Sequence, residues 1–123
     1  MRTGQEHPAT PRATTRPQVK DLAWAAGFIE GEGTFTTCDR GPRTNLLLKL
    51  SVTQVQREPL DRLARYFGGR IRCVDDGRPG CLPRHEWYVT GARARGVTMT
   101  LYAWLSPRRR MQVLRGGLRL RVA

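Results

Sequence analysis

A stretch near the start of the chain, residues 25–33, constrains the fold more than any other feature of the sequence. It reads Ala-Ala-Gly-Phe-Ile-Glu-Gly-Glu-Gly, and its small residues would let two helices touch backbone to backbone. Gly27 and Gly31 are four residues apart, so they lie on one face of a helix. Because glycine is a costly helix residue, two of them within an apolar run indicate close helix packing.

The end of this predicted helix carries an acidic side chain, Glu32, followed by Gly33. We expect Gly33 to end the helix in the left-handed conformation that glycine favours. The carbonyl end of a helix carries partial negative charge and repels a carboxylate unless a cation is near. The position of Glu32 therefore predicts a metal site. The alternative is that Glu32 is a solvated residue at a helix end.

The charge of the chain predicts a polyanionic partner. Its 123 residues include 22 Lys+Arg and 10 Asp+Glu, a net charge of +12, and only Lys20 and Lys49 are lysine. Such a surplus favours nucleic acid, and arginine adds a planar fork suited to phosphates and guanine edges. The alternative is that the arginine content reflects coding bias alone.

Length and cysteine content bound the class of protein. The chain fits one domain with a real core, and no apolar stretch approaches the roughly 20 residues of a membrane helix, so no membrane partner is expected. Cys38, Cys73 and Cys81 are an odd count in a sequence without a secretory signal. We expect reduced thiols in the cytoplasm of a bacterium or phage host, with an organelle as the alternative. Cys73, Cys81 and His85 lack the close spacing of zinc ligands.

Hydrophobic periodicity predicts alternating helices and β-hairpins. Residues 45–53 are the clearest case, since apolar and polar residues alternate there and Leu47 is the only apolar residue on the polar face. We expect residues 1–17 to form a flexible basic arm and residues 18–123 to form one domain. The expected elements are helices over 21–31, 59–67, 97–105 and 107–114, and strands over 34–38, 45–53, 70–74 and 86–89. This order predicts an α+β fold whose antiparallel sheet has helices on one face and a basic, wet face suited to the DNA major groove.

Residues 25–33 resemble the motif of the LAGLIDADG homing endonucleases. The motif is matched at Ala26, Gly27, Ile29 and Gly33, with acids at residues 30 and 32 and a phenylalanine in place of leucine at residue 28. Segments 50–72 and 87–112 are similar to later strands and helices of the family, so the resemblance covers residues 20–115. The element order predicted from periodicity is also the αββαββα order of that family, with one further helix at the end.

The resemblance implies a saddle-shaped sheet seated on double-stranded DNA and a site-specific endonuclease that cuts both strands with Mg²⁺ or Mn²⁺. Family members with one motif copy form homodimers through the motif helix. For this chain the implied dimer interface includes Ala23, Ala26 and Gly27. A symmetric dimer requires a near-palindromic target, because each subunit reads one half-site.

The resemblance also assigns catalytic roles. Glu32 matches the acid that coordinates the divalent metal, and Gln54 matches a polar residue that positions solvent near the cleaved phosphate. Arg108 is the candidate, by its offset from Leu105, for the basic residue that stabilises transition-state charge. Glu30 matches an acid that is chiefly structural in the family. Gln54 as an ordinary strand-end residue and Arg108 as a solvated phosphate-binding residue stay open as alternatives.

The identity of the basic pocket residue also stays open among four arginines. They are Arg57, Arg108, Arg109 and Arg110. The chain is shorter than the family before Leu60, which leaves the alignment of Arg57 unsafe.

Strand residues in phase with the polar face are candidates for reading DNA. Arg and Lys can pair with guanine, Asn with adenine, and Glu can accept a hydrogen bond from cytosine. The candidates are Thr36, Cys38, Arg40, Asn45, Lys49, Ser51, Arg70, Arg72, Arg84, Glu86 and Tyr88. Each alone is a weak signal, but their shared phase is opposite to that of the apolar strand residues.

Two other functions compete with an active nuclease. One is a catalytically inactive relative that acts as an intron maturase or a DNA-binding regulator, although the retained motif acids argue against decay. The other is a small basic structural protein such as a ribosomal component, which explains the charge but not the Gly-Glu-Gly helix end.

Overall fold

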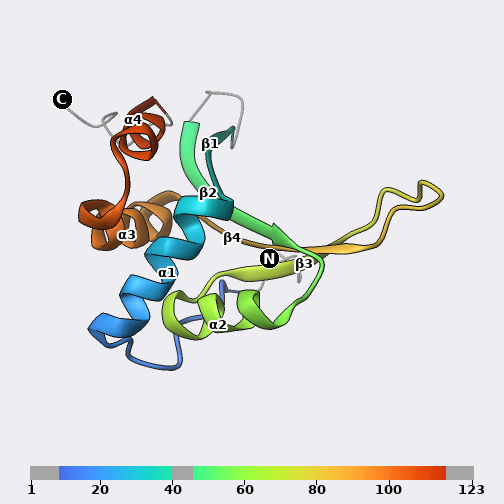
Figure 1. Cartoon of the computed structure of the whole chain (residues 1–123), viewed down its shortest axis with the longest axis horizontal. Helices are drawn as coiled ribbons and strands as arrows, with labels where there is room; N and C mark the ends of the chain where they lie inside the picture. The colour runs from blue at the N-terminus through green and yellow to red at the C-terminus, as the bar shows by residue number, and fades with distance from the viewer. Residues whose placement is uncertain (1–8, 40–45, 116–123) are drawn as a thin grey trace, which may run out of the picture.

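The computed structural model describes residues 9–39 and 46–115, which form an α+β fold (Figure 1). The helices are α1 (Val19–Glu32), α2 (Glu58–Phe67), α3 (Gly91–Leu101), the 3₁₀ helix η1 (Tyr102–Trp104) and α4 (Pro107–Arg115). The strands are β1 (Gly33–Asp39), β2 (Leu46–Gln54), β3 (Arg70–Val74) and β4 (Arg84–Thr90). The predicted order of helices and hairpins is confirmed. No helix in these ranges has both the length and the apolar character needed to cross a bilayer.

The four strands form one antiparallel sheet in the order β1-β2-β4-β3. Its apolar face packs under the helices, where Leu50, Val52, Trp87 and Val89 are buried. Val52 lies opposite Trp87 and Leu50 lies opposite Val89, so the predicted alternation of β2 and β4 sets the register. In Figure 1 the loop that joins β3 to β4 extends away from the rest of the molecule.

The third helix differs most from its predicted boundaries. It was expected over 97–105, but α3 begins at Gly91 directly after β4 and ends at Leu101. Gly91 has a φ of 61°, a conformation that lets β4 turn straight into the helix. The small and basic residues at the start of α3 obscure its periodicity, although Ala94, Val97 and Leu101 are buried at helical spacing.

Gly33 ends α1 for a reason that differs from the prediction. Its φ is −79°, so the expectation of a left-handed terminator is wrong. A Cβ at this position would lie 2.8 Å from both Cγ2 and the carbonyl oxygen of Ile29, which is too close for any side chain. Glycine is required here by space, and it lets β1 leave the helix directly.

Part of the predicted flexible arm packs against the domain. The amides of Thr14 and Thr15 donate to the carbonyl of Arg65 at 2.9 and 3.0 Å, and Gly69 donates to the carbonyl of Pro11 at 3.0 Å. These bonds satisfy backbone groups at the end of α2 that the helix itself leaves free. The prediction of a free arm is therefore wrong for residues 11–15, whereas residues 1–8 lie outside the described part of the chain.

Asp21 joins α1 to α2. Its carboxylate accepts from the amide of Gln18 at 2.9 Å and from the hydroxyl of Tyr66 at 3.0 Å, and it lies 3.7 Å from the guanidinium of Arg62. The pKa of Asp21 is lowered, chiefly by the bond from Gln18, with Tyr66, Lys20 and Arg62 acting in the same direction against the effect of burial. The folded state therefore favours the charged carboxylate.

Asp21→Asn is expected to lower the free energy of unfolding at pH 7. Because the folded pKa lies below the ordinary value of 3.8, this stabilisation is fully present above that value and is lost as the pH falls through the folded pKa. Urea unfolding measures the free energy of unfolding of the wild type and of Asp21→Asn from pH 7 downward. The two free energies should converge as the pH falls below 3.8 and through the folded pKa of Asp21. Asp61→Asn is the control, since its ion pair with Arg57 is exposed. A difference that persists unchanged at the lowest pH would contradict this assignment.

Candidate functional site

The face of the sheet opposite the helices carries the predicted polar and basic side chains. The register places Thr36 beside Lys49, Ser51 beside Tyr88, and Arg72 beside Glu86 across neighbouring strands. The DNA-binding candidates that share this face are Thr36, Cys38, Lys49, Ser51, Arg70, Arg72, Arg84, Glu86 and Tyr88. Arg40 and Asn45 lie outside the described residues. The phase that the sequence predicted for this face agrees with the strand register.

Glu86 lies at the centre of this face and forms ion pairs with two of its basic residues, Lys49 and Arg72. It is 8% exposed, and its two carboxylate oxygens lie 2.6 Å from Nε of Arg72 and 3.5 Å from Nζ of Lys49. The Lys49 ammonium also lies 5.1 Å from the centre of the Tyr88 ring. The side chain that was expected to read cytosine therefore fixes two basic neighbours in the free chain.

Glu32 and Gln54, which are 22 residues apart, meet at one end of the sheet. Glu32 is the last residue of α1 and Gln54 is the last residue of β2. Nε2 of Gln54 donates to Oε1 of Glu32 at 2.9 Å in an exposed position. The structure thus brings together two of the three predicted catalytic residues and holds one carboxylate oxygen in place.

The three consecutive arginines after Pro107 have three different environments. Arg109 is 8% exposed and Arg110 is half-buried, donating to the carbonyls of Tyr102 and Ala103. Arg108 is exposed and makes no hydrogen bond or ion pair within residues 9–39 and 46–115. Of the three, Arg108 is the one whose guanidinium is available to a ligand.

Arg109 supplies the cation that the helix end requires. Its guanidinium donates to the carbonyls of Ile29 at 3.3 Å, Glu30 at 3.0 Å and Gly33 at 2.7 Å. The anomaly of an acidic residue at the negative end of a helix is therefore compensated within the chain, and it is not by itself an argument for metal. The sequence held a signal for this role, because Arg109 is in helical phase with the buried Val113.

Arg57 lies in another part of the surface. It forms an exposed ion pair with Asp61 at 3.1 Å and lines a cavity of 530 Å³ together with Arg70, Arg72 and Tyr88. The cavity opens at β3, an edge strand of the sheet. Arg57 thus lies at the β3 edge of the sheet, in a cavity that α2 and the polar face both line.

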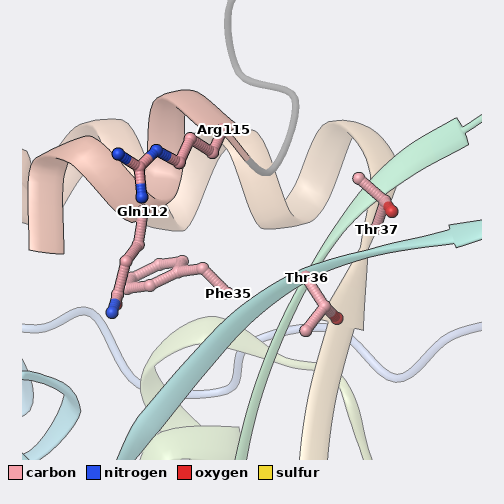
Figure 2. A pocket seen from close by; sticks show the side chains of 5 residues that line it. All are labelled: Phe35, Thr36, Thr37, Gln112 and Arg115. Carbon is pink, nitrogen blue, oxygen red and sulfur yellow. The ribbon is translucent and has the colours of Figure 1, made fainter.

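A smaller cavity of 320 Å³ lies between β1 and α4. Figure 2 shows Gln112 and Arg115 extending from α4 beside Phe35, while Thr36 and Thr37 line the strand side. None of the predicted catalytic residues lines this cavity. Gln112 links it to the helix end instead, because its Oε1 accepts from Nη1 of Arg109 at 2.7 Å.

The exposed face of α1 differs in one residue from the predicted dimer interface. Ala23, Gly27 and Gly31 are exposed and follow one another at intervals of four. Ala26 is only 2% exposed and packs in the core of its own chain, so its prediction as a residue on the dimer face is corrected. A Cβ added at Gly27 or Gly31 would meet no described atom within 4 Å. The packing reason for these glycines is therefore not found within the described chain.

The donor set fits a metal that binds few protein ligands. In the described ranges no three His, Cys, Asp or Glu side chains gather as a metal site. One exposed carboxylate, Glu32, suits Mg²⁺ or Mn²⁺, which take one or two carboxylates and complete their shell with water and phosphate oxygens. The set does not suit zinc, which requires three or four protein ligands.

No protein-family model and no curated protein matches this sequence. Among solved structures, the chain is similar to the homing endonuclease I-CvuI in complex with its target, with a TM-score of 0.64 and 21% identity over 79% of this chain and 65% of that one. It is also similar to the archaeal intron-encoded homing endonuclease I-Vdi141I complexed with DNA, with a TM-score of 0.59 and 22% identity over 77% of this chain and 64% of that one. The group I intron-encoded homing endonuclease I-CeuI, complexed with DNA, matches with a TM-score of 0.59 and 18% identity over 81% of this chain and 53% of that one.

The chain therefore spans less than two thirds of the length of these three structures. The shared part includes the element order and antiparallel sheet described above. The resemblance seen in residues 25–33 is thus confirmed at the level of the fold: this chain has the fold of the LAGLIDADG homing endonucleases.

Proposed function

We propose that this chain is a site-specific double-strand DNA endonuclease that acts as a homodimer with Mg²⁺ or Mn²⁺. The observation that carries the proposal is the contact between Glu32 and Gln54 at the end of α1. It places a fixed, exposed carboxylate next to the glycine-lined face of the same helix. The DNA complexes of the similar proteins support a nucleic-acid partner.

Dimerisation through α1 explains its exposed small residues. Pairing along Ala23, Gly27 and Gly31 would let two helices touch backbone to backbone and would bring the two helix ends together. Each copy would then contribute one Glu32 near the symmetry axis. A twofold dimer on DNA implies a near-palindromic target.

Three residues of the chain would have different roles in cleavage. Glu32 would hold the divalent cation, which supplies Lewis-acid stabilisation and an activated water when bound. The Gln54 amide fixes Oε1 of Glu32 and leaves its own carbonyl oxygen to orient water. Arg108, whose side chain is exposed, is proposed to stabilise phosphate charge that develops during cleavage.

The polar face would bind the duplex. Lys49 on β2 and Arg70 and Arg72 on β3 provide positive charge on both sides of β4, and Tyr88 on β4 and Ser51 on β2 provide hydrogen-bonding groups. Phosphate contacts set affinity, whereas contacts to base edges set the sequence that is preferred.

Selection from a randomised duplex library tests the proposal. The purified chain is used to select duplexes in Ca²⁺, and a plasmid carrying the selected sequence is then incubated with Mg²⁺ or Mn²⁺. We expect linear plasmid cut on both strands at one position. Salt-sensitive binding without nicking in any divalent cation would instead support the inactive alternative, a maturase or a DNA-binding regulator.

Glu86→Gln is expected to strengthen non-specific DNA binding and to reduce sequence preference. Removal of the carboxylate frees Lys49 and Arg72 for phosphates, so the slope of log affinity against log salt should steepen by about one to two. Fluorescence anisotropy over a salt series measures both effects. Glu58→Gln changes the net charge equally at an exposed residue of α2 and is the control. Equal slopes for the two variants would contradict this role of Glu86.

A further inference from the structure

Helices α1 and α4 form hydrogen bonds to the free backbone groups at each other's ends. The guanidinium of Arg109, from α4, binds three carbonyls at the end of α1, and the carboxylate of Glu30, from α1, accepts from the amide of Ser106 at 2.9 Å. The last turn of α1 has no basic residue of its own. We propose that this reciprocal cap positions Glu32, so that Arg109 and Glu30 are positioning residues of the proposed nuclease. The inference rests on the proposed function.

The cap holds the backbone on both sides of Glu32. Arg109 binds the carbonyl of Glu30 before it and the carbonyl of Gly33 after it. A helix end leaves four carbonyls without partners, and here one rigid guanidinium satisfies several of them. The flanking residues Gly31 and Gly33 give this segment little intrinsic rigidity. Arg109 therefore holds the backbone that carries Glu32, and Gln54 holds the carboxylate at its tip.

Arg109 is itself fixed on every side. Nη1 donates to Gln112 at 2.7 Å, and the guanidinium carbon lies 5.9 Å from the centre of the Phe35 ring. Figure 2 shows Gln112 reaching down from α4 beside Phe35. The backbone amide of Arg109 also donates to Oγ of Ser106 at 3.3 Å, which caps the start of α4. Because its guanidinium and its backbone are both held by hydrogen bonds, Arg109 fixes the end of α1 relative to α4.

The position of a metal-binding carboxylate affects the rate of catalysis even when the shift is small. A shift of about 1 Å in a reacting or ligating group can cost roughly a hundredfold in rate, and loss of an outer partner of a metal ligand typically costs about 10- to 100-fold in metal affinity. Arg109 is 8% exposed and its guanidinium donates to carbonyls and to Gln112 within the chain, so we expect no direct contact with substrate. Its effect on cleavage would act through Glu32.

The test compares Arg109→Gln with Arg93→Gln. Arg93 is a matched control, since its guanidinium donates to the carbonyl of Phe67 at the end of another helix, α2. We expect Arg109→Gln to raise the Mn²⁺ concentration for half-maximal cleavage by about tenfold or more and to lower kcat, with DNA affinity in EDTA unchanged. In the free protein, hydrogen exchange at the amide of Gly33 should accelerate, because its bond to Ile29 lies within the cap. Arg93→Gln should leave the Mn²⁺ concentration for half-maximal cleavage, kcat and hydrogen exchange at Gly33 unchanged.

The outcomes separate this inference from the proposed function. If the wild-type chain cleaves and Arg109→Gln shows faster exchange at Gly33 with an unchanged Mn²⁺ requirement, the cap is only structural and the inference is overturned. If the wild-type chain cleaves no DNA in any divalent cation, the proposed function fails first. Should Arg109→Gln not fold, Gln112→Ala replaces it: a rise of about threefold in the Mn²⁺ requirement supports the inference, and no rise overturns it.

Discussion

Replacement of Glu32 by glutamine is expected to lower double-strand cleavage by at least about a thousandfold, equivalent to roughly 4 kcal/mol of transition-state stabilisation. The amide keeps the size of the side chain but removes the charge that would hold the cation. Because Glu32 lies at a helix end and not on the polar sheet face, DNA affinity in EDTA should be retained. Single-turnover cleavage of a selected duplex, with anisotropy on the same duplex, measures both quantities.

Glu58→Gln is the control for this prediction, because it makes the same chemical change at an exposed residue in the first turn of α2. It should cleave at the wild-type rate. Cleavage by Glu32→Gln at that same rate would show that the metal assignment is wrong. Equal loss of binding and cleavage would instead mean that Glu32 contributes to docking of DNA.

Gly27→Leu is expected to block dimerisation while making the single chain more stable. In the free chain a side chain at Gly27 meets nothing within 4 Å, and leucine is favoured over glycine in a helix by about 0.5–1 kcal/mol. Between two closely packed helices the same side chain would overfill the contact at a cost of roughly 1–3 kcal/mol per copy. The dissociation constant of the dimer should then rise about a hundredfold, and double-strand cleavage should fall with it.

Gly96→Leu separates the interface from helix propensity. Gly96 is exposed in α3 and also has no atom within 4 Å of an added Cβ, so the monomer gains helix propensity in the same way. Sedimentation velocity and thermal unfolding of the two variants give the comparison. A Gly27→Leu protein that still dimerises and cleaves both strands would rule out α1 as the interface.

The sheet was the most predictable part of the molecule. In β2 the alternation of Leu48, Leu50 and Val52 with polar residues identifies the buried face without any structure. A one-residue slip would expose every one of these side chains, so the pattern also fixes the register with β4. That is why the polar face could be assigned residue by residue.

The contacts at the helix ends could not be predicted, because they join residues far apart in sequence. Helical phase with Val113 marks Arg109 as the inward-facing one of the three arginines, but the sequence does not show that the end of α1 is what it meets. By periodicity Ala26 could lie on the core face or on the exposed face of α1, and in the structure it is buried in the core of its own chain. Pro11 lies in a segment of low apolar content, and it is held by backbone bonds that leave no trace in side-chain patterns.

The most direct test is a crystal structure of the chain on its selected duplex with Mn²⁺, located by anomalous scattering. The proposal predicts two copies of the chain, paired through α1, with manganese bound by Glu32 of each copy beside the phosphates at the centre of the site. One copy on the duplex, or manganese held by other side chains, would contradict it.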